Sequence, residues 1–163
     1  MSQANAGRPR VLVADPDPEI TALLARQLEW SGYDVSVAVN GRDTLDLVKR
    51  LRPSALVLEA KMELVNGYQV VRTLREDPLN RLMPVVMISA RAGKLDRDFA
   101  FTVGADEYVK KPFLTSELVA KLTLLAPSGI APAVEAAPEP QPKPFTARRT
   151  RQPLRPVPAL AAR

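Results

Sequence analysis

The stretch Ser54-Ala55-Leu56-Val57-Leu58-Glu59 sets a short apolar run directly before an acidic residue. Apolar residues in succession, without the alternation of a half-exposed strand, are typical of a strand buried on both faces of a parallel sheet. The stretch Arg10-Val11-Leu12-Val13-Ala14 has the same character and ends abruptly in Asp15-Pro16-Asp17-Pro18. The sequence therefore predicts two buried strands, each followed by an acidic side chain at its carboxyl end.

Strands and helices alternate along the first three quarters of the chain. Asp17 is placed to cap a first helix that begins at Pro18 and ends before Gly32. The expected strands are 10–14, 33–38, 55–58, 85–88 and 106–109. The other expected helices are 42–51, one following Asn66-Gly67, one ending near Val103, and 117–125. Five such units predict a doubly wound α/β fold with a parallel sheet covered on both faces.

The composition limits the chemistry that the chain can perform. It has 163 residues, enough for one core, and contains neither cysteine nor histidine. Disulfides, thiol nucleophiles, thiolate or imidazole zinc sites and histidine bases are therefore excluded. We expect a cytoplasmic protein without a transmembrane segment, because no apolar stretch approaches the roughly 20 residues needed to span a bilayer.

Three segments differ in composition. Residues 1–9 are expected to be a flexible N-terminus, and residues 10–125 hold the alternating pattern. Residues 126–163 contain 9 of the 16 prolines and carry 6 basic and 2 acidic side chains, which is net +4 of the total +5. This Pro-, Ala- and Arg-rich tail is predicted to be disordered.

The order of polar residues at the strand ends resembles the receiver domain of bacterial two-component response regulators. Gly67 follows Glu59 by eight residues, and Lys111-Pro112-Phe113 lies far downstream. The resemblance covers residues 10–125 and implies a flavodoxin-like (βα)5 fold with strand order 2-1-3-4-5. It places Asp15 and Pro16 at the two acidic positions, Glu59 at the phosphate-accepting aspartate, Ser89 at the switch hydroxyl, Tyr108 at the switch aromatic, and Lys111 and Pro112 at a lysine-proline pair joined by a cis peptide bond.

Two of these positions depart from the family pattern. The resemblance implies phosphoryl transfer to an aspartate, assisted by magnesium and a lysine. Pro16 stands where the family has a carboxylate that contacts the metal, and proline offers no side-chain oxygen. No metal or cofactor is therefore expected, except weak magnesium binding at Asp15 and Glu59. Asp17 is a possible substitute ligand, but its position before Pro18 favours helix capping.

Glu59 has several possible roles, which the sequence leaves open. It is either an ion-pair partner that Lys111 needs, or a signalling residue. As a signalling residue it would accept hydrogen bonds from Ser89 and Lys111 and mimic a phosphorylated aspartate, or it would leave the switch in its resting form. Lys61, two residues later, is a possible counter-ion for Asp15 and Glu59, although a lysine there would more commonly project into solvent.

Three functional hypotheses follow from the resemblance. The first is an atypical single-domain response regulator, a pseudo-receiver that is not an enzyme and signals by protein–protein contact without aspartyl phosphorylation. The second is a phosphorylatable response regulator that is charged by a histidine kinase. The third is a receiver-dimerised protein that binds nucleic acid or an acidic membrane surface through the basic cluster Arg148, Arg149, Arg151 and Arg155 of its tail.

The surface expected to meet a protein partner or a second copy comprises the fourth helix, fifth strand and fifth helix. It includes Tyr108, Lys110, residues 117–121 and one of Phe99 and Phe101. These two phenylalanines lie two residues apart in a predicted helix and so cannot both face the core. One exposed aromatic is therefore expected, as is typical of an interaction patch.

Overall fold

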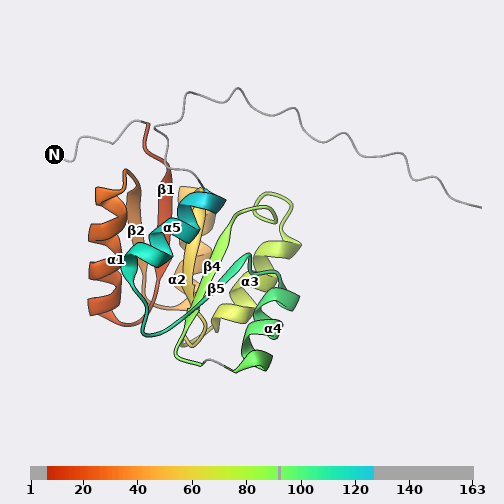
Figure 1. The fold of residues 1–163 in the computed structure, drawn as a ribbon. Helices are drawn as coiled ribbons and strands as arrows, with labels where there is room; N and C mark the ends of the chain where they lie inside the picture. Colours follow the sequence, from red (N-terminus) through yellow and green to blue (C-terminus); the bar gives the residue numbers. More distant parts are fainter. Residues whose placement is uncertain (1–6, 92, 127–163) are drawn as a thin grey trace, which may run out of the picture. The chain divides into compact units, whose positions relative to one another are not determined.

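The computed structural model describes residues 7–91 and 93–126. The predictions for residues 1–6 and for the tail 127–163 lie outside the described residues. Five parallel strands form one sheet in the order β2-β1-β3-β4-β5 (Figure 1). This confirms the fold class and the strand order implied by the resemblance. None of the described helices is long and apolar enough to cross a membrane.

The elements alternate strictly along the chain. Their bounds are β1 Arg10–Ala14, α1 Pro18–Trp30, β2 Asp34–Ala38, α2 Gly41–Leu51, β3 Ala55–Glu59, α3 Gly67–Glu76, β4 Val85–Ser89, α4 Lys94–Val103, β5 Glu107–Lys110 and α5 Thr115–Leu125. The predicted ends coincide with these or differ from them by one or two residues. Strand β3 includes Glu59, which pairs with Ile88 of β4. Helix α5 begins two residues before Glu117, without a side-chain cap that would mark its start in the sequence.

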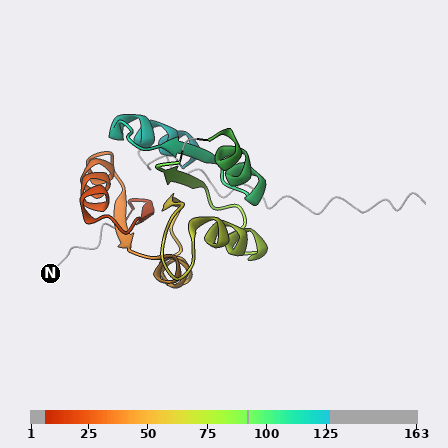
Figure 2. The same cartoon turned by 90° about the horizontal axis from the view of Figure 1, so that it is seen from below.

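The sheet separates two apolar cores. On one face, Leu12, Leu56 and Met87 pack with buried side chains of α2, α3 and α4. On the other face, Val13 and Val57 pack with buried side chains of α1 and α5. Figure 2 shows the sheet between these two groups of helices. Burial on both faces explains why the strands are continuous apolar runs.

Two local features fix the loops at the carboxyl ends of the strands. The Asp17 side chain accepts a hydrogen bond of 2.9 Å from the backbone N–H of Glu19, and Pro18 opens α1, which confirms the predicted cap. Gly67 opens α3 so close to β3 that an added Cβ would lie 2.4 Å from the Glu59 carbonyl oxygen. Helix α3 is thereby seated directly against the end of β3.

Candidate functional site

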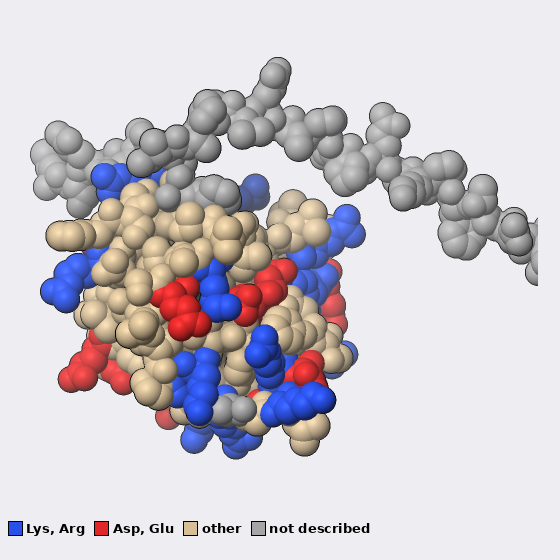
Figure 3. All heavy atoms as spheres, viewed as in Figure 1, with Lys and Arg blue, Asp and Glu red and all other residues tan. Residues whose placement is uncertain are grey.

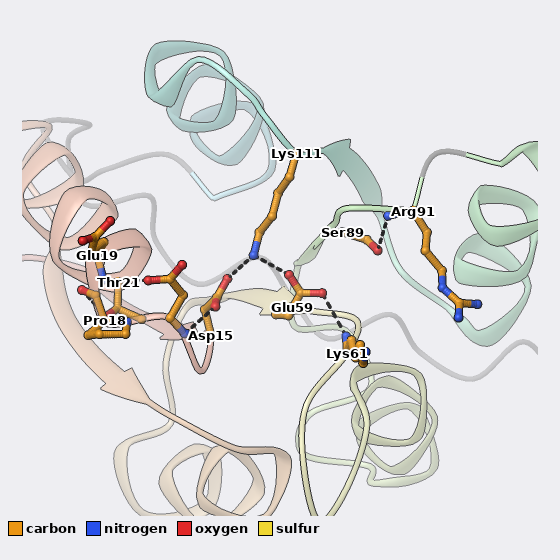
Figure 4. Close-up of polar contacts among 10 residues, drawn as sticks. Asp15, Pro18, Glu19, Thr21, Glu59, Lys61, Ser89, Arg91 and Lys111 are labelled. Carbon is orange, nitrogen blue, oxygen red and sulfur yellow. Dashed lines mark hydrogen bonds and ion pairs between the residues drawn. The ribbon is translucent and has the colours of Figure 1, made fainter.

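A cavity of about 250 Å³ lies at the carboxyl ends of the strands, where ligands bind in doubly wound sheets (Figure 4). Its lining comprises Asp15, Pro16, Asp17, Glu59, Lys61, Ser89, Ala90, Arg91 and Lys111. All the pocket residues that the resemblance aligned therefore come together, apart from Tyr108 and Pro112. The Lys111–Pro112 peptide bond is cis, as the resemblance implies.

Lys111 is the electrostatic centre of this pocket. Its ammonium lies 2.7 Å from Asp15 Oδ2 and 2.5 Å from Glu59 Oε2, and the two carboxylate side chains are only 1% and 7% exposed. Buried carboxylates of this kind need an opposite charge. Burial alone lowers the pKa of Lys111, but the hydrogen bonds and charges of Asp15 and Glu59 outweigh it and raise that pKa above its ordinary value.

The remaining oxygens of the two carboxylates bind backbone N–H groups. Asp15 Oδ1 accepts a hydrogen bond of 2.8 Å from Asp17, and Glu59 Oε1 accepts one of 2.9 Å from Lys61. Each carboxylate thus fixes the loop that follows its own strand and uses its other oxygen for Lys111 (Figure 4). The pocket forms one hydrogen-bonded network across β1, β3 and the loop after β5.

Lys61 enters this network through its backbone. Its side chain is exposed, and no ion pair between its ammonium and either carboxylate occurs among the described residues. Lys111 therefore fills the counter-ion role that was considered possible for Lys61, and the exposed Lys61 side chain agrees with the more common, solvent-facing placement.

The donor set fits magnesium poorly. Magnesium prefers near-octahedral coordination by oxygen. Pro16 supplies no side-chain oxygen, and the Asp17 carboxylate caps α1. No group of three acidic residues suited to a metal occurs in the described part of the chain. An ammonium bound to both Asp15 and Glu59 would also have to give way before these two carboxylates could share a cation.

The switch residues are joined through Arg91, a residue that no sequence pattern singled out. The Ser89 hydroxyl accepts a hydrogen bond of 3.1 Å from the Arg91 N–H, and the Tyr108 hydroxyl donates one of 2.7 Å to the Arg91 carbonyl. Ser89 and Tyr108 are both buried. Because these contacts use only the backbone of Arg91, no side-chain pattern could have revealed them.

Glu59 does not bind Ser89. The phosphorylation mimic, one of the roles left open for Glu59, requires hydrogen bonds from both Ser89 and Lys111, and only the contact with Lys111 is present among the described residues. Ser89 instead stabilises its own loop. The structure therefore contains half of the arrangement that the mimic hypothesis describes.

The α4–β5–α5 surface carries more exposed aromatic area than expected. Phe99 is 51% and Phe101 39% exposed, so both phenylalanines are partly open to solvent rather than one. The Phe99 ring lies 5.0 Å from that of Tyr68, and the Arg97 guanidinium lies 5.6 Å from the ring centroid of Phe101. Phe99 thus contacts α3, whereas Phe101 contacts an arginine of its own helix.

A groove of about 440 Å³ runs along the same surface. It is lined by Arg97, Glu107, Tyr108, Val109, Lys110, Pro112, Glu117 and Lys121. Lys121 and Glu107 form an ion pair of 3.1 Å within it. Acidic and basic side chains also stand next to each other across the face seen in Figure 3. The surface thus offers both signs of charge beside exposed aromatic rings.

Comparisons with known proteins agree with this architecture. Residues 11–123 match the family described as "Response regulator receiver domain". Transcriptional regulatory protein PrrA of Mycobacterium leprae is 41% identical over 117 residues, which are 72% of this chain and 49% of PrrA. DNA-binding response regulator MtrA of Mycolicibacterium smegmatis is 37% identical over 115 residues, 71% of this chain and 49% of MtrA. The chain thus spans about half the length of these curated relatives.

A solved structure extends the agreement to three dimensions. The receiver domain of Francisella response regulator 1452 is 30% identical and matches with a TM-score of 0.69, covering 72% of this chain and 96% of that domain. The matched family, the strand order and the pocket at the strand ends lead to one conclusion: the chain belongs to the response regulator receiver domain family.

Proposed function

We propose that this receiver domain passes a signal by contact of its α4–β5–α5 surface with a protein partner, and that its pocket is not charged by phosphoryl transfer in the usual way. The observation that carries the proposal is the position of the Lys111 ammonium, which binds Asp15 and Glu59 together. Pro16 lies beside them, where the resemblance places a metal-binding carboxylate.

The chemistry of phosphoryl transfer supports this interpretation. An attacking carboxylate oxygen must be free to approach phosphorus in line, while cations neutralise charge on the transferring oxygens. Both oxygens of Glu59 are already bound, one to Lys111 and the other to the N–H of Lys61. Pro16 has no side-chain oxygen to help hold a cation. Less positive charge is therefore available to neutralise the transferring oxygens and to offset the loss of these contacts.

The buried state of Tyr108 supports a readout that does not depend on phosphate. Its hydroxyl is bound to the Arg91 carbonyl, and its ring belongs to the core shared by α2, α3 and α4. The resemblance implies that this aromatic switches between an inward and an outward arrangement. In this chain the Glu59 carboxylate holds Lys111 without a phosphoryl group, and Tyr108 lies in the inward position beneath the proposed partner surface.

Titration with magnesium and beryllofluoride tests this proposal. We expect the backbone amide signals of Ser89, Arg91 and Tyr108 to remain unchanged in the unaltered chain. The matched control is the double variant Pro16→Asp, Glu59→Asp, which replaces both departures by the carboxylates of the family pattern. This variant should show saturable shifts. Saturable shifts in the unaltered chain would overturn the proposal.

The second candidate is a phosphorylatable response regulator charged by a histidine kinase, and the comparisons favour it over a pocket that has lost this chemistry. The relatives of this chain include proteins described as a response regulator and as a transcriptional regulatory protein. Asp15, Ser89, Tyr108 and Lys111 all remain in place. Incubation with acetyl phosphate followed by intact-mass measurement distinguishes the candidates: a phosphorylated species lost in Glu59→Gln supports the second.

A further inference from the structure

Strand β2 is an open edge of the sheet. It pairs with β1 alone, and its carboxyl end is followed by Val39, which is 56% exposed, while Val37 within the strand is 42% exposed. Figure 2 shows β2 at the margin of the sheet, between α1 and α2. An edge strand presents unpaired backbone groups and can template pairing with another strand.

The backbone of β2 is oriented to accept such a strand. The Asp34 N–H and the Ala38 carbonyl both bind on the β1 side, to Pro9 and Asp15 respectively. Successive residues of a strand direct their backbone groups to alternate sides. The N–H and C=O groups of Val35 and Val37 therefore point outward from the sheet.

The usual protections of an edge strand are missing from β2. Proteins block such edges with lysine, proline or inward-pointing charge. The other edge strand, β5, carries Glu107 and Lys110 and is followed by Pro112. In β2 the one charged residue is Asp34, and that carboxylate is paired with Arg10 at 2.7 Å. The two edges of the sheet thus differ in how readily they admit another strand.

A groove of about 640 Å³ follows the same edge. It is lined by Val37, Ala38 and Val39 and by the α2 residues Asp43, Asp46, Leu47, Lys49 and Arg50. Among the α2 residues that line this groove, the two acidic ones come first and the two basic ones follow. Neither Asp46 nor Arg50 takes part in an ion pair within the described ranges. Both charges are available to an incoming molecule.

We propose that a second copy of this chain binds here, with the two β2 strands antiparallel and joined into one continuous sheet. A two-fold axis beside Ser36 sets Val35 opposite Val37 of the second copy. The same axis sets the acidic groove residues of α2 against the basic groove residues of α2 in the other copy. Asp46 of each copy then faces Arg50 of the other, so the charge pattern is self-complementary.

Sedimentation equilibrium of the whole chain measures the dimer dissociation constant. Val37→Lys introduces a charge at the paired edge and is expected to raise this constant by at least about tenfold. Leu95→Lys is the matched control, since Leu95 is 83% exposed on α4, and it should leave the constant unchanged. Dimerisation abolished by Leu95→Lys but retained in Val37→Lys would overturn the proposal in favour of the α4–β5–α5 surface.

A charge exchange tests the register independently of strand folding. Asp46→Lys and Arg50→Glu each set like charges against one another in the homodimer, so each variant alone should dimerise at least about tenfold more weakly. An equal mixture restores opposite charges and should recover the heterodimer. Asp43 is left unchanged because it supports the Asn40 cap of α2. Failure of the mixture to associate would contradict the antiparallel arrangement.

Amide hydrogen exchange gives a direct readout of the paired backbone. Exchange at Val35 and Val37 should slow as the protein concentration rises, whereas exchange at Lys110 on β5 should not change. A chain that stays monomeric at every concentration, or a dimer with unprotected Val35 and Val37, would overturn the proposal. Either result would leave this edge open to an extended segment of a different protein instead.

Discussion

At the residue scale, Lys111 governs the stability of the pocket. Lys111→Met leaves Asp15 and Glu59 as neighbouring buried carboxylates without a counter-ion. We expect the free energy of unfolding at neutral pH to fall by about 3 kcal/mol, at the low end for a broken buried ion pair because the Lys111 side chain keeps some exposure. Urea unfolding measures this loss. Lys110→Met is the control, and an equal loss there would contradict the assignment.

The pKa of Lys111 also predicts how stability depends on pH. Because that pKa is raised in the folded protein from an ordinary value of 10.5, the stabilisation is fully present below pH 10.5. It is then lost as the pH rises through the higher pKa of the folded protein. The difference in unfolding free energy between the unaltered chain and Lys111→Met should shrink above pH 10.5. A difference that stays constant there would contradict the raised pKa.

The sequence predicted which side chains meet in this pocket better than it predicted their partners. Asp17 was recognisable as a cap because Pro18 follows it, and the residues that line the cavity follow strands whose carboxyl ends share one edge. The hydrogen bonds that the Lys61 N–H donates to Glu59 and the Arg91 N–H donates to Ser89 involve backbone groups. Every residue but proline carries such a group, so residue type gives no signal for them.

At the element scale, Arg75 connects α3 to two loops. Its guanidinium donates to the carbonyls of Gly104 and Met83, each at 2.9 Å, and to the Asp106 carboxylate at 2.9 Å. Arg75→Met should lower the unfolding free energy by about 2 to 4 kcal/mol, because these acceptors lose their donors in a partly buried site. Thermal and urea unfolding measure the change.

The control for Arg75 lies on the same helix. Arg72 pairs with Glu76 across exposed side chains, so Arg72→Met should cost no more than about 0.5 kcal/mol. Similar losses in the two variants would show that the contacts of Arg75 with the loops add nothing beyond those of a surface ion pair.

Gly67 sets the distance between α3 and β3. In Gly67→Ala the new Cβ meets the Glu59 carbonyl oxygen and the Ala60 Cα, both of which belong to backbone that cannot rotate away. We expect a loss of about 1 to 3 kcal/mol. Gly93→Ala is the control, since its Cβ would meet only the movable Asp96 carboxylate. Equal unfolding midpoints for Gly67→Ala and the unaltered chain would contradict the close approach.

At the scale of the whole molecule, residue patterns predicted the layers but not the order of the strands. Continuous apolar runs required burial on both faces, and the two cores on either side of the sheet satisfy that requirement. The order 2-1-3-4-5 came from the resemblance, because hydrophobic periodicity is the same for any arrangement of buried strands. The open β2 edge likewise emerges only once its neighbours are known.

Tyr33 joins two distant parts of the chain across this architecture. It precedes β2, and its fully buried hydroxyl donates to the Ala126 carbonyl at 2.6 Å, beyond the end of α5. Tyr33→Phe keeps the ring but leaves that carbonyl without its donor, so we expect a loss of about 1 to 3 kcal/mol in unfolding free energy. Urea unfolding measures it, and amide exchange should quicken most at Leu122 and Ala126.

The neighbouring Thr123 provides the control for this contact. Its hydroxyl lies 3.3 Å from that of Tyr33 and donates to the Val119 carbonyl of its own helix. Thr123→Val keeps the bond from Tyr33 to Ala126 and should therefore cost less than Tyr33→Phe. If Tyr33→Phe instead left exchange in α5 unchanged, packing of Leu118 and Leu122 against the sheet would be sufficient to hold the helix, and the hydroxyl would have no part in closing this face of the domain.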